Sequence, residues 1–245
     1  MRPENLPGFI RWRSFPDRDT LASVMTEYVA ELLDHAINER NVASLMVSGG
    51  STPVPFFRSL ARQELDWENI TIGLVDDRLV PVDHQDSNEK LVRENLLVEQ
   101  AGKAQFVGLV PRELNGHDFS TGRFDSEITA LCERKLARIP QPVDVIILGM
   151  GNDGHTASLF PDTEGLALAM DRNRSARCCV MRPPHAPHTR ISLTSKMLFA
   201  APSRILHICG QDKLATLEQA LLADDLETMP IRAFLQAPMK IFWSP

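Results

Sequence analysis

Hydrophobic residues follow two different spacings along the chain, and together they predict strands that alternate with helices. Short apolar runs predict buried strands, at 44–48, 70–75, 105–110, 143–148, 178–181, 190–193, 204–209 and 239–243. Apolar residues three and four positions apart predict amphipathic helices, at 19–40, 54–63, 88–96, 120–139, 194–200, 214–222 and 229–235. Such alternation is typical of an α/β fold with a parallel sheet that helices cover on both faces.

The composition is that of an ordinary globular protein, since 43% of the 245 residues are hydrophobic and 24% are charged. We see no internal repeat and no linker, so we expect one domain, residues 1–245. The N-terminal segment lacks the apolar core of a secretory signal, and no run of about 18 apolar residues occurs. The four cysteines form no CxxC pair and no zinc-site spacing. We therefore expect a reduced, cytoplasmic protein with no metal and no membrane segment.

The formal net charge of −6 sets a condition on the ligand. It argues against a dedicated nucleic-acid-binding protein, which would carry a basic surface. An anionic small molecule would be repelled by the overall field. We therefore expect any such ligand to be held by a local cluster of basic residues.

The first predicted strand, 44–48, runs into a loop of glycines and hydroxyl residues. The loop consists of Gly49, Gly50, Ser51 and Thr52. Glycines allow close approach of the backbone, free N–H groups can point at an anion, and hydroxyls add donors. The loop is not a Walker motif, because no Gly-Lys-Ser/Thr sequence follows it. Two interpretations stay open from this loop alone, a phosphate cradle and a tight turn without a ligand.

Charged residues follow two other predicted strands. Asp76, Asp77 and Arg78 come directly after strand 70–75 and can meet a polar ligand, although a solvated turn is the favoured explanation when this segment is taken alone. Lys213 lies just after the glycine that ends strand 204–209. A cation is unfavourable at a helix N-terminus, so Lys213 is better explained by a nearby anion than by solvent exposure alone.

A second glycine loop, with Gly149, Gly151 and Gly154, matches the GxGxxG pattern of dinucleotide-binding proteins. That interpretation requires a long helix after the loop. We expect only a short helix, starting at Thr156 or Ser158 and limited by Pro161, which is too short for a βαβ crossover. The pattern therefore does not predict a nucleotide site.

The same loop contains Asp153 and His155, which suggest proton-transfer chemistry. Near neutral pH an imidazole can accept a proton from water, and a nearby carboxylate can fix its tautomer. No serine or cysteine lies in a nucleophile motif such as GxSxG, which favours direct attack by water. The alternative is a histidine that only caps a helix or forms a hydrogen bond within the loop.

At this point the sequence resembles a known family. The segment GMGNDGHTASLFP (149–161) closely resembles the signature of 6-phosphogluconolactonases, which share a superfamily with glucosamine-6-phosphate isomerase/deaminases. Other segments agree in the same order, namely SGGSTP (48–53), DDRLVP (76–81), DSN (86–88), RISLT (190–194) and GQDK (210–213). Isomerases typically continue the DGH motif with Ile-Ala-Phe-Asn-Glu-Pro, whereas this chain has the lactonase form.

The resemblance implies a three-layer αβα sandwich with a mostly parallel, Rossmann-like sheet. It also implies hydrolysis of 6-phospho-D-glucono-1,5-lactone to 6-phospho-D-gluconate, in the oxidative pentose phosphate pathway, without cofactor or metal. His155 would be the general base and Asp153 its orienting partner. The substrate and its phosphate would be bound by the other matching residues, Gly49, Gly50, Ser51, Thr52, Asp76, Arg78, Arg190 and Lys213.

Three departures from the family pattern and two rival functions remain. Asp77 stands where lactonases usually have glutamate, Val75 replaces a usual glycine, and the chain ends soon after Trp243. The rivals are an isomerase/deaminase and a non-catalytic sugar-phosphate sensor. The sequence leaves the oligomeric state open, and also whether segment 182–188 closes over the substrate.

Overall fold

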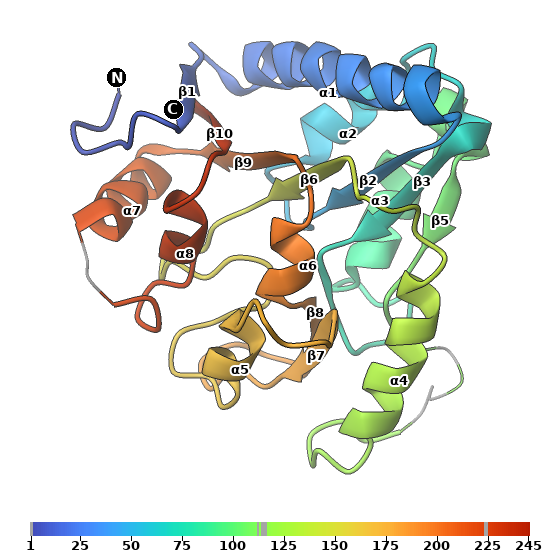
Figure 1. Cartoon of the computed structure of the whole chain (residues 1–245), viewed down its shortest axis with the longest axis vertical. Coiled ribbons are helices and arrows are strands. Elements are labelled where there is room, and N and C mark those ends of the chain that lie inside the picture. The colour runs from blue at the N-terminus through green and yellow to red at the C-terminus, as the bar shows by residue number, and fades with distance from the viewer. Residues whose placement is uncertain (1, 112, 114–116, 223–224) are drawn as a thin grey trace.

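The computed structural model describes residues 2–111, 113, 117–222 and 225–245. The Asn115-Gly116 pair, whose residue types predict a turn, lies outside these residues. The centre of the structure is a sheet of seven parallel strands, in the order β1-β10-β9-β6-β2-β3-β5 (Figure 1). The strands are β1 (Arg11–Ser14), β2 (Ala43–Val47), β3 (Ile70–Leu74), β5 (Gln105–Val107), β6 (Val145–Leu148), β9 (Ser203–Cys209) and β10 (Lys240–Ser244). The predicted parallel sheet is therefore confirmed.

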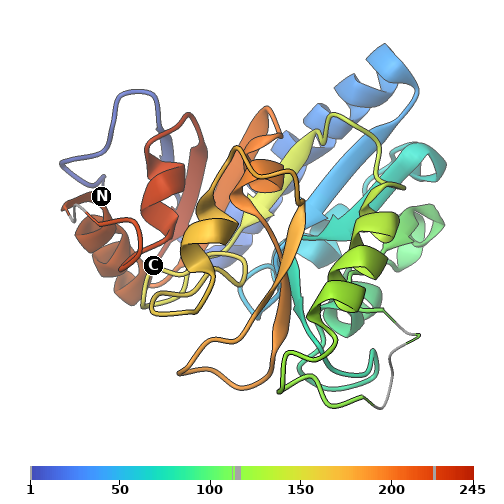
Figure 2. The same ribbon diagram turned by 60° about the horizontal axis from the view of Figure 1, so that its bottom comes forward.

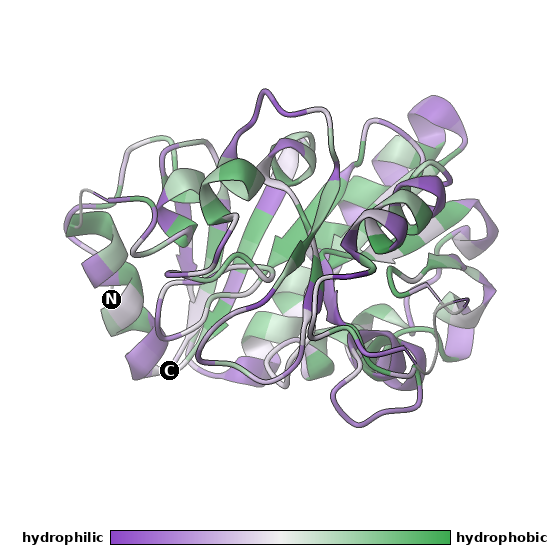
Figure 3. Cartoon of the chain, turned by 90° about the horizontal axis from the view of Figure 1, so that it is seen from below, coloured by the Kyte–Doolittle hydropathy of each residue, from purple (hydrophilic) through white to green (hydrophobic). Residues whose placement is uncertain are grey.

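Helices lie on both faces of this sheet, as the α/β prediction requires (Figures 1 and 3). They are α1 (Arg18–Arg40), α2 (Val54–Leu60), α3 (Asn88–Asn95), α4 (Asp125–Leu136), α5 (Leu166–Met170), α6 (Ser195–Phe199), α7 (Gln211–Leu222) and α8 (Ile231–Leu235), with two 3₁₀ turns, Trp67–Asn69 and Glu99–Lys103. Asp17 caps α1, because its carboxylate accepts a hydrogen bond from the Thr20 N–H at 2.7 Å. None of the helices in the described part of the chain is long and apolar enough to cross a membrane.

The buried side chains form one continuous hydrophobic cluster that joins the sheet to its helices. Every residue of β2, β3 and β6 is buried, which is expected for central parallel strands covered on both faces. Figure 3 shows the green, hydrophobic strands between helices whose purple residues lie outward. This continuity supports the single-domain organisation, which remains a prediction.

A second, smaller sheet was not predicted. It consists of β4 (Asp76–Arg78), β8 (Arg190–Leu193) and β7 (Cys178–Met181), all antiparallel. The chain passes from one sheet to the other at Val75, whose N–H bonds to the Val47 carbonyl and whose own carbonyl accepts from the Leu193 N–H. The β7–β8 hairpin, in orange, projects from one edge of the main sheet (Figure 2).

Two local predictions were wrong or incomplete. No helix follows Gly154, because Thr156 and Leu159 instead form an isolated antiparallel bridge and the Thr156 hydroxyl donates to the Gly149 carbonyl at 2.8 Å. This removes the remaining support for a dinucleotide loop. Strand β1, which pairs with β10 and brings the two chain ends together, was not predicted from the sequence.

The strand order places the two glycine loops side by side. The chain moves outward from β2 to β3 and β5 on one side, and then returns to β6 on the other side of β2. The loops that follow β2 and β6 therefore meet at a topological switch point, at the carboxyl edge of the sheet. This is the position at which open α/β sheets bind their ligands.

Candidate active site

A pocket of about 350 Å³ lies at this switch point, within the range of small-molecule sites. It is bounded by the loops after β2, β6 and β9 and by the small antiparallel sheet. All of the predicted site residues except Asp153 line it: Gly49, Gly50, Ser51, Thr52, Asp76, Arg78, His155, Arg190 and Lys213. Asp153 lies immediately behind His155 and touches its ring. The structure therefore brings together residues that are far apart in the sequence.

The loop after β2 presents main-chain donors to the pocket. Within the described residues, the N–H groups of Gly50, Ser51 and Thr52 have no hydrogen-bond acceptor. Gly49 is required by close approach, because a Cβ atom there would lie 1.9 Å from the Asn88 Oδ1 atom. Asn88 is 3% exposed and donates to the Asp76 carbonyl at 2.9 Å, so it cannot easily withdraw. The loop thus offers free donors in a fixed position.

Two arginines face the pocket from neighbouring strands. Arg78 on β4 and Arg190 on β8 are directly opposite each other in the antiparallel register. Their guanidinium groups form hydrogen bonds to neutral acceptors, including the carbonyls of Asp86 and Pro187, but no ion pair with a carboxylate is found for either within the described ranges. The Nε atoms of both are buried without a partner.

This arrangement is electrostatically unfavourable without a ligand. Like charges directly opposite each other across two strands destabilise a sheet. Burial lowers the pKa of Arg190 and the charge of Arg78 lowers it further, and the nearby carboxylates of Asp76, Asp77 and Asp86 offset only part of this effect. An anion between the two guanidinium groups would relieve the repulsion and satisfy the unpartnered donors. Such a site supplies the local positive charge that the net charge of −6 demands.

Lys213 adds a third cation. It lies in the first turn of α7 and lines the same pocket. In the part of the chain that the structure describes, its ammonium group has no hydrogen-bond or ion-pair partner. The predicted basic cluster is thus present as an arrangement, and its role in binding stays a prediction.

His155 and Asp153 form a hydrogen-bonded pair on the loop after β6. The His155 Nδ1 and Asp153 Oδ1 atoms are 2.6 Å apart, and the same oxygen accepts the His155 N–H at 3.1 Å. Gly151 makes room for this pair, because a Cβ atom there would lie 2.1 Å from His155 Nδ1. Phe160 stacks on the imidazole with ring centroids 3.9 Å apart, and its ring also contacts the Arg190 guanidinium. The ring of His155 is therefore held from two sides.

The pair fixes which nitrogen of His155 can act as a base. Burial raises the pKa of Asp153, but the hydrogen bonds and charge of His155 outweigh it, and the net pKa lies below the ordinary value. Asp153 is therefore ionised at neutral pH and can only accept. The proton of a neutral His155 must then lie on Nδ1. This leaves the lone pair of Nε2 available for a proton from water.

The two aspartates after β3 have different surroundings. Asp76 lines the pocket and accepts a hydrogen bond from the Ser158 hydroxyl at 2.5 Å. Asp77 is fully buried and accepts three backbone N–H groups, of Asn88 at 2.7 Å, Arg78 at 2.8 Å and Glu89 at 3.0 Å. Burial raises the pKa of Asp77 to about 7, against the effect of these donors. Asp77 therefore anchors the start of α3 and does not line the pocket.

Asn88 and His207 are among the pocket residues that the sequence analysis did not name as site residues. Asn88, predicted only as part of a helix cap, joins Gly49, Asp76 and Arg78 through its side chain. His207 on β9 is 5% exposed, and burial lowers its pKa to about 4, so it is neutral at pH 7. The only sequence signal for His207 as a site residue was its position near the carboxyl end of a predicted strand. An apolar strand around a single histidine gave no reason to choose it.

The fold and the pocket define the chain as an α/β protein whose pocket, at the carboxyl edge of a parallel sheet, is lined by three cationic side chains and by His155. Comparison with known proteins shows the family to which the chain belongs. Residues 16–243 match the family model of glucosamine-6-phosphate isomerases/6-phosphogluconolactonase, and the chain belongs to this family.

Several similar proteins carry the name of one branch of that family. A 6-phosphogluconolactonase of Pseudomonas aeruginosa is 46% identical over 217 residues, which cover 89% of this chain and 87% of the relative. Another, of Pseudomonas putida, is 42% identical and covers 98% and 95% of the two chains. The crystal structure of a 6-phosphogluconolactonase from Shewanella baltica aligns with a TM-score of 0.89 at 38% identity, over 96% of this chain and 98% of that one. The predicted resemblance to the lactonases is therefore confirmed.

Proposed function

We propose that this chain hydrolyses 6-phospho-D-glucono-1,5-lactone to 6-phospho-D-gluconate, with His155 as the general base. The observation that carries the proposal is the Asp153–His155 pair beside a pocket with unpaired cationic groups. The base and the anion site lie close enough to serve one small substrate, since both line a pocket of about 350 Å³. The similarity to lactonases supports the choice of substrate.

The reaction proceeds by direct attack of water. Nε2 of His155 accepts a proton from water as the oxygen bonds to the lactone carbonyl carbon, C1. The carbonyl oxygen becomes an oxyanion, which the N–H groups of the glycine loops or an arginine stabilise. Collapse of this intermediate breaks the bond between C1 and the ring oxygen, and the ring oxygen takes the proton from His155. The carboxylic acid product then loses a proton to solvent, and His155 is again neutral.

The remaining polar groups hold the substrate. The free N–H groups at 50–52 and the hydroxyls of Ser51 and Thr52 fit a phosphate. Arg78, Arg190 and Lys213 supply positive charge. Asp76, oriented by Ser158, is placed to accept a hydrogen bond from a sugar hydroxyl.

One experiment separates this function from its two rivals. Fresh 6-phosphogluconolactone is followed by NMR with and without the protein, against the spontaneous hydrolysis. A lactonase accelerates the loss of lactone, whereas a sugar-phosphate sensor binds 6-phosphogluconate and leaves the spontaneous rate unchanged. An isomerase/deaminase instead releases ammonia from glucosamine 6-phosphate. Lactone loss at the spontaneous rate with folded protein would refute the proposal.

Replacing Lys213 with alanine is expected to raise KM for the phosphorylated lactone by about tenfold or more, because a charge-assisted hydrogen bond contributes roughly 1.5–3 kcal/mol. Hydrolysis of an unphosphorylated gluconolactone should change little. Steady-state kinetics on both substrates measure the difference. Equal losses on both would remove Lys213 from the phosphate site.

Replacing Arg190 with methionine should weaken the binding of 6-phosphogluconate by about tenfold or more, for the same electrostatic reason. The same change removes the repulsion with Arg78, so the unliganded protein should lose little thermal stability. Calorimetric titration and thermal unfolding report the two effects separately. Unchanged affinity for 6-phosphogluconate would contradict the proposed anion site.

A further inference from the structure

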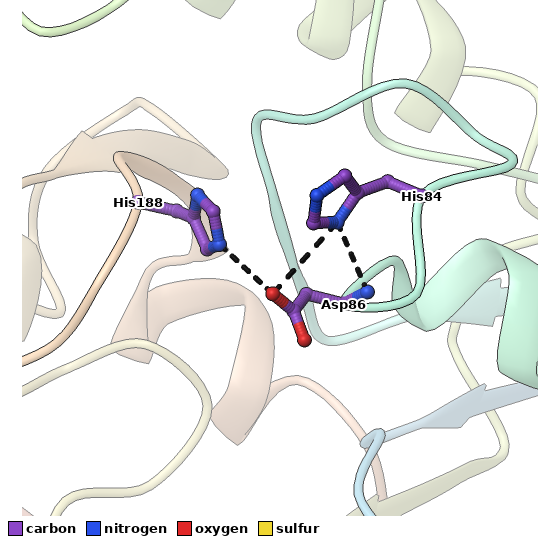
Figure 4. A group of neighbouring side chains, drawn as sticks. All are labelled: His84, Asp86 and His188. Atoms are coloured by element: carbon purple, nitrogen blue, oxygen red, sulfur yellow. Dashed lines mark hydrogen bonds and ion pairs between the residues drawn. The ribbon is translucent and has the colours of Figure 1, made fainter.

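Three side chains outside the catalytic pair converge at the rim of the pocket. His84 and Asp86 belong to the loop before α3, and His188 belongs to the loop before β8 (Figure 4). Asp86 Oδ2 lies 3.0 Å from His188 Nε2 and 3.8 Å from His84 Nδ1, and the two imidazole rings meet edge to face, with centroids 5.4 Å apart. One ligand atom from each residue can be chosen so that all three lie within 4.8 Å of one another. Both histidines therefore point at the same carboxylate.

These separations suit a tetrahedral metal ion. Zinc binds imidazole nitrogen and carboxylate oxygen at about 2.0–2.2 Å, so neighbouring ligand atoms of a tetrahedral site lie about 3.3–3.5 Å apart. The distances of 3.0 and 3.8 Å from Asp86 Oδ2 fall on either side of this value, and all three ligand atoms lie within 4.8 Å of one another. All three residues are half-buried, which leaves a fourth position open to water.

One hydrogen bond of the cluster shows which nitrogen of His84 is free of a proton. The Asp86 N–H donates to His84 Nδ1 at 3.1 Å, so this nitrogen carries no proton and can become a ligand at the expense of that bond.

His188 has a left-handed backbone, with φ of 70°, which is uncommon for a residue other than glycine. Its Nε2 proton, now shared with Asp86, would move to Nδ1 or to solvent on metal binding.

We propose that His84, Asp86 and His188 form a site for a divalent ion such as Zn²⁺. The ion would cross-link the loop before α3 to the loop before β8. Each loop already contacts a pocket arginine, since Arg78 donates to the Asp86 carbonyl at 2.8 Å and Arg190 to the Pro187 carbonyl at 3.3 Å. The ion would therefore fix the two loops that hold the pocket's guanidinium groups. It takes no part in the proposed proton transfer at His155.

The ligand set also selects the ion. Two imidazoles and one carboxylate suit Zn²⁺, and Co²⁺ or Ni²⁺ as substitutes, whereas Mg²⁺ and Ca²⁺ prefer sites made of oxygen ligands. The expectation of no metal rested on cysteine and histidine spacing along the chain and on the resemblance to the lactonases. It did not anticipate this cluster, because His84 and His188 come together only in the fold.

Calorimetric titration of the metal-free full chain with Zn²⁺ tests the proposal, with Mg²⁺ as the control ion. We expect one Zn²⁺ per chain, and a loss of affinity of about tenfold or more in His84→Ala and in His188→Ala. His185→Ala is the matched control, because His185 lies exposed in the same loop outside the cluster, and its affinity should stay within about twofold. Absence of zinc binding, or equal affinity in all three variants, would overturn the site.

A second measurement on the unmodified protein covers the case in which a variant fails to fold. X-ray absorption at the zinc edge should show nitrogen and oxygen neighbours with the scattering of two imidazoles. A sulfur neighbour would place the ion at a cysteine instead and would refute the assignment. Saturating Zn²⁺, but not Mg²⁺, should also raise the unfolding temperature by a few degrees, because the ion binds only the folded arrangement of the two loops.

Discussion

Replacement of His155 with alanine is expected to lower kcat for lactone hydrolysis by about 10²–10⁴-fold, the range typical for loss of a general base. The KM should change much less, since the proposed phosphate contacts lie in other residues. The reason is specific to the geometry. Asp153 Oδ1 lies 2.6 Å from His155 Nδ1 and keeps the imidazole proton on that nitrogen. Nε2 is therefore the basic atom beside the pocket.

The measurement must separate enzymatic from spontaneous hydrolysis, because the lactone also opens without a catalyst. NMR rates at several enzyme concentrations give kcat after subtraction of the background. His35→Ala is a suitable control, since His35 is exposed on α1 and its partner is Glu39. A His155→Ala variant that folds normally and keeps a near-normal kcat would show that the base has been assigned to the wrong residue.

The central fold was predictable because its signals are local. Buried parallel strands appear as short apolar runs, and a helix such as α1 shows its spacing and its Asp17 cap within its own sequence. The small sheet was not predictable in this way. Strand β4 has only three residues, all charged, and it exists because β8 pairs with it from more than a hundred positions later.

The predicted helix after Gly154 shows the opposite case, in which local signals were misleading. Thr156 and Ser158 are suitable helix caps, but in the fold the hydroxyl of Thr156 binds the Gly149 carbonyl and that of Ser158 binds Asp76. The two hydroxyls therefore form hydrogen bonds to residues that line the pocket, and no helix starts there. A tertiary partner decided the local structure, as it commonly does for short polar segments.

The place of the pocket was predictable from the sequence, but the opposition of its two arginines was not. Glycine loops and polar strand ends pointed to the carboxyl edge of the sheet, which is where the pocket lies. The opposition of Arg78 and Arg190 depends on the register of an unpredicted sheet. The approach of His84 and His188 was also not predictable, because the two residues come from loops far apart in the sequence.

Replacement of Asp153 with asparagine should lower kcat by about 10²–10³-fold while the protein stays folded. In serine proteases the equivalent change costs about 10⁴, because asparagine favours the wrong histidine tautomer. Here the Asp153 side chain is 45% exposed, so water can partly replace it and a smaller loss is expected.

The physical cause gives a signature that distinguishes orientation of His155 from a general structural role. The Asp153 carboxylate can only accept, so it keeps the imidazole proton on Nδ1. An asparagine amide can donate to Nδ1, which shifts the proton to Nε2 and removes the lone pair that would accept a proton from water. Proton–nitrogen NMR of the imidazole should therefore show Nδ1–H in the wild type and a large share of Nε2–H in Asp153→Asn. An unchanged tautomer together with a large loss of kcat would mean that Asp153 contributes through its charge, and the orienting role would have to be abandoned.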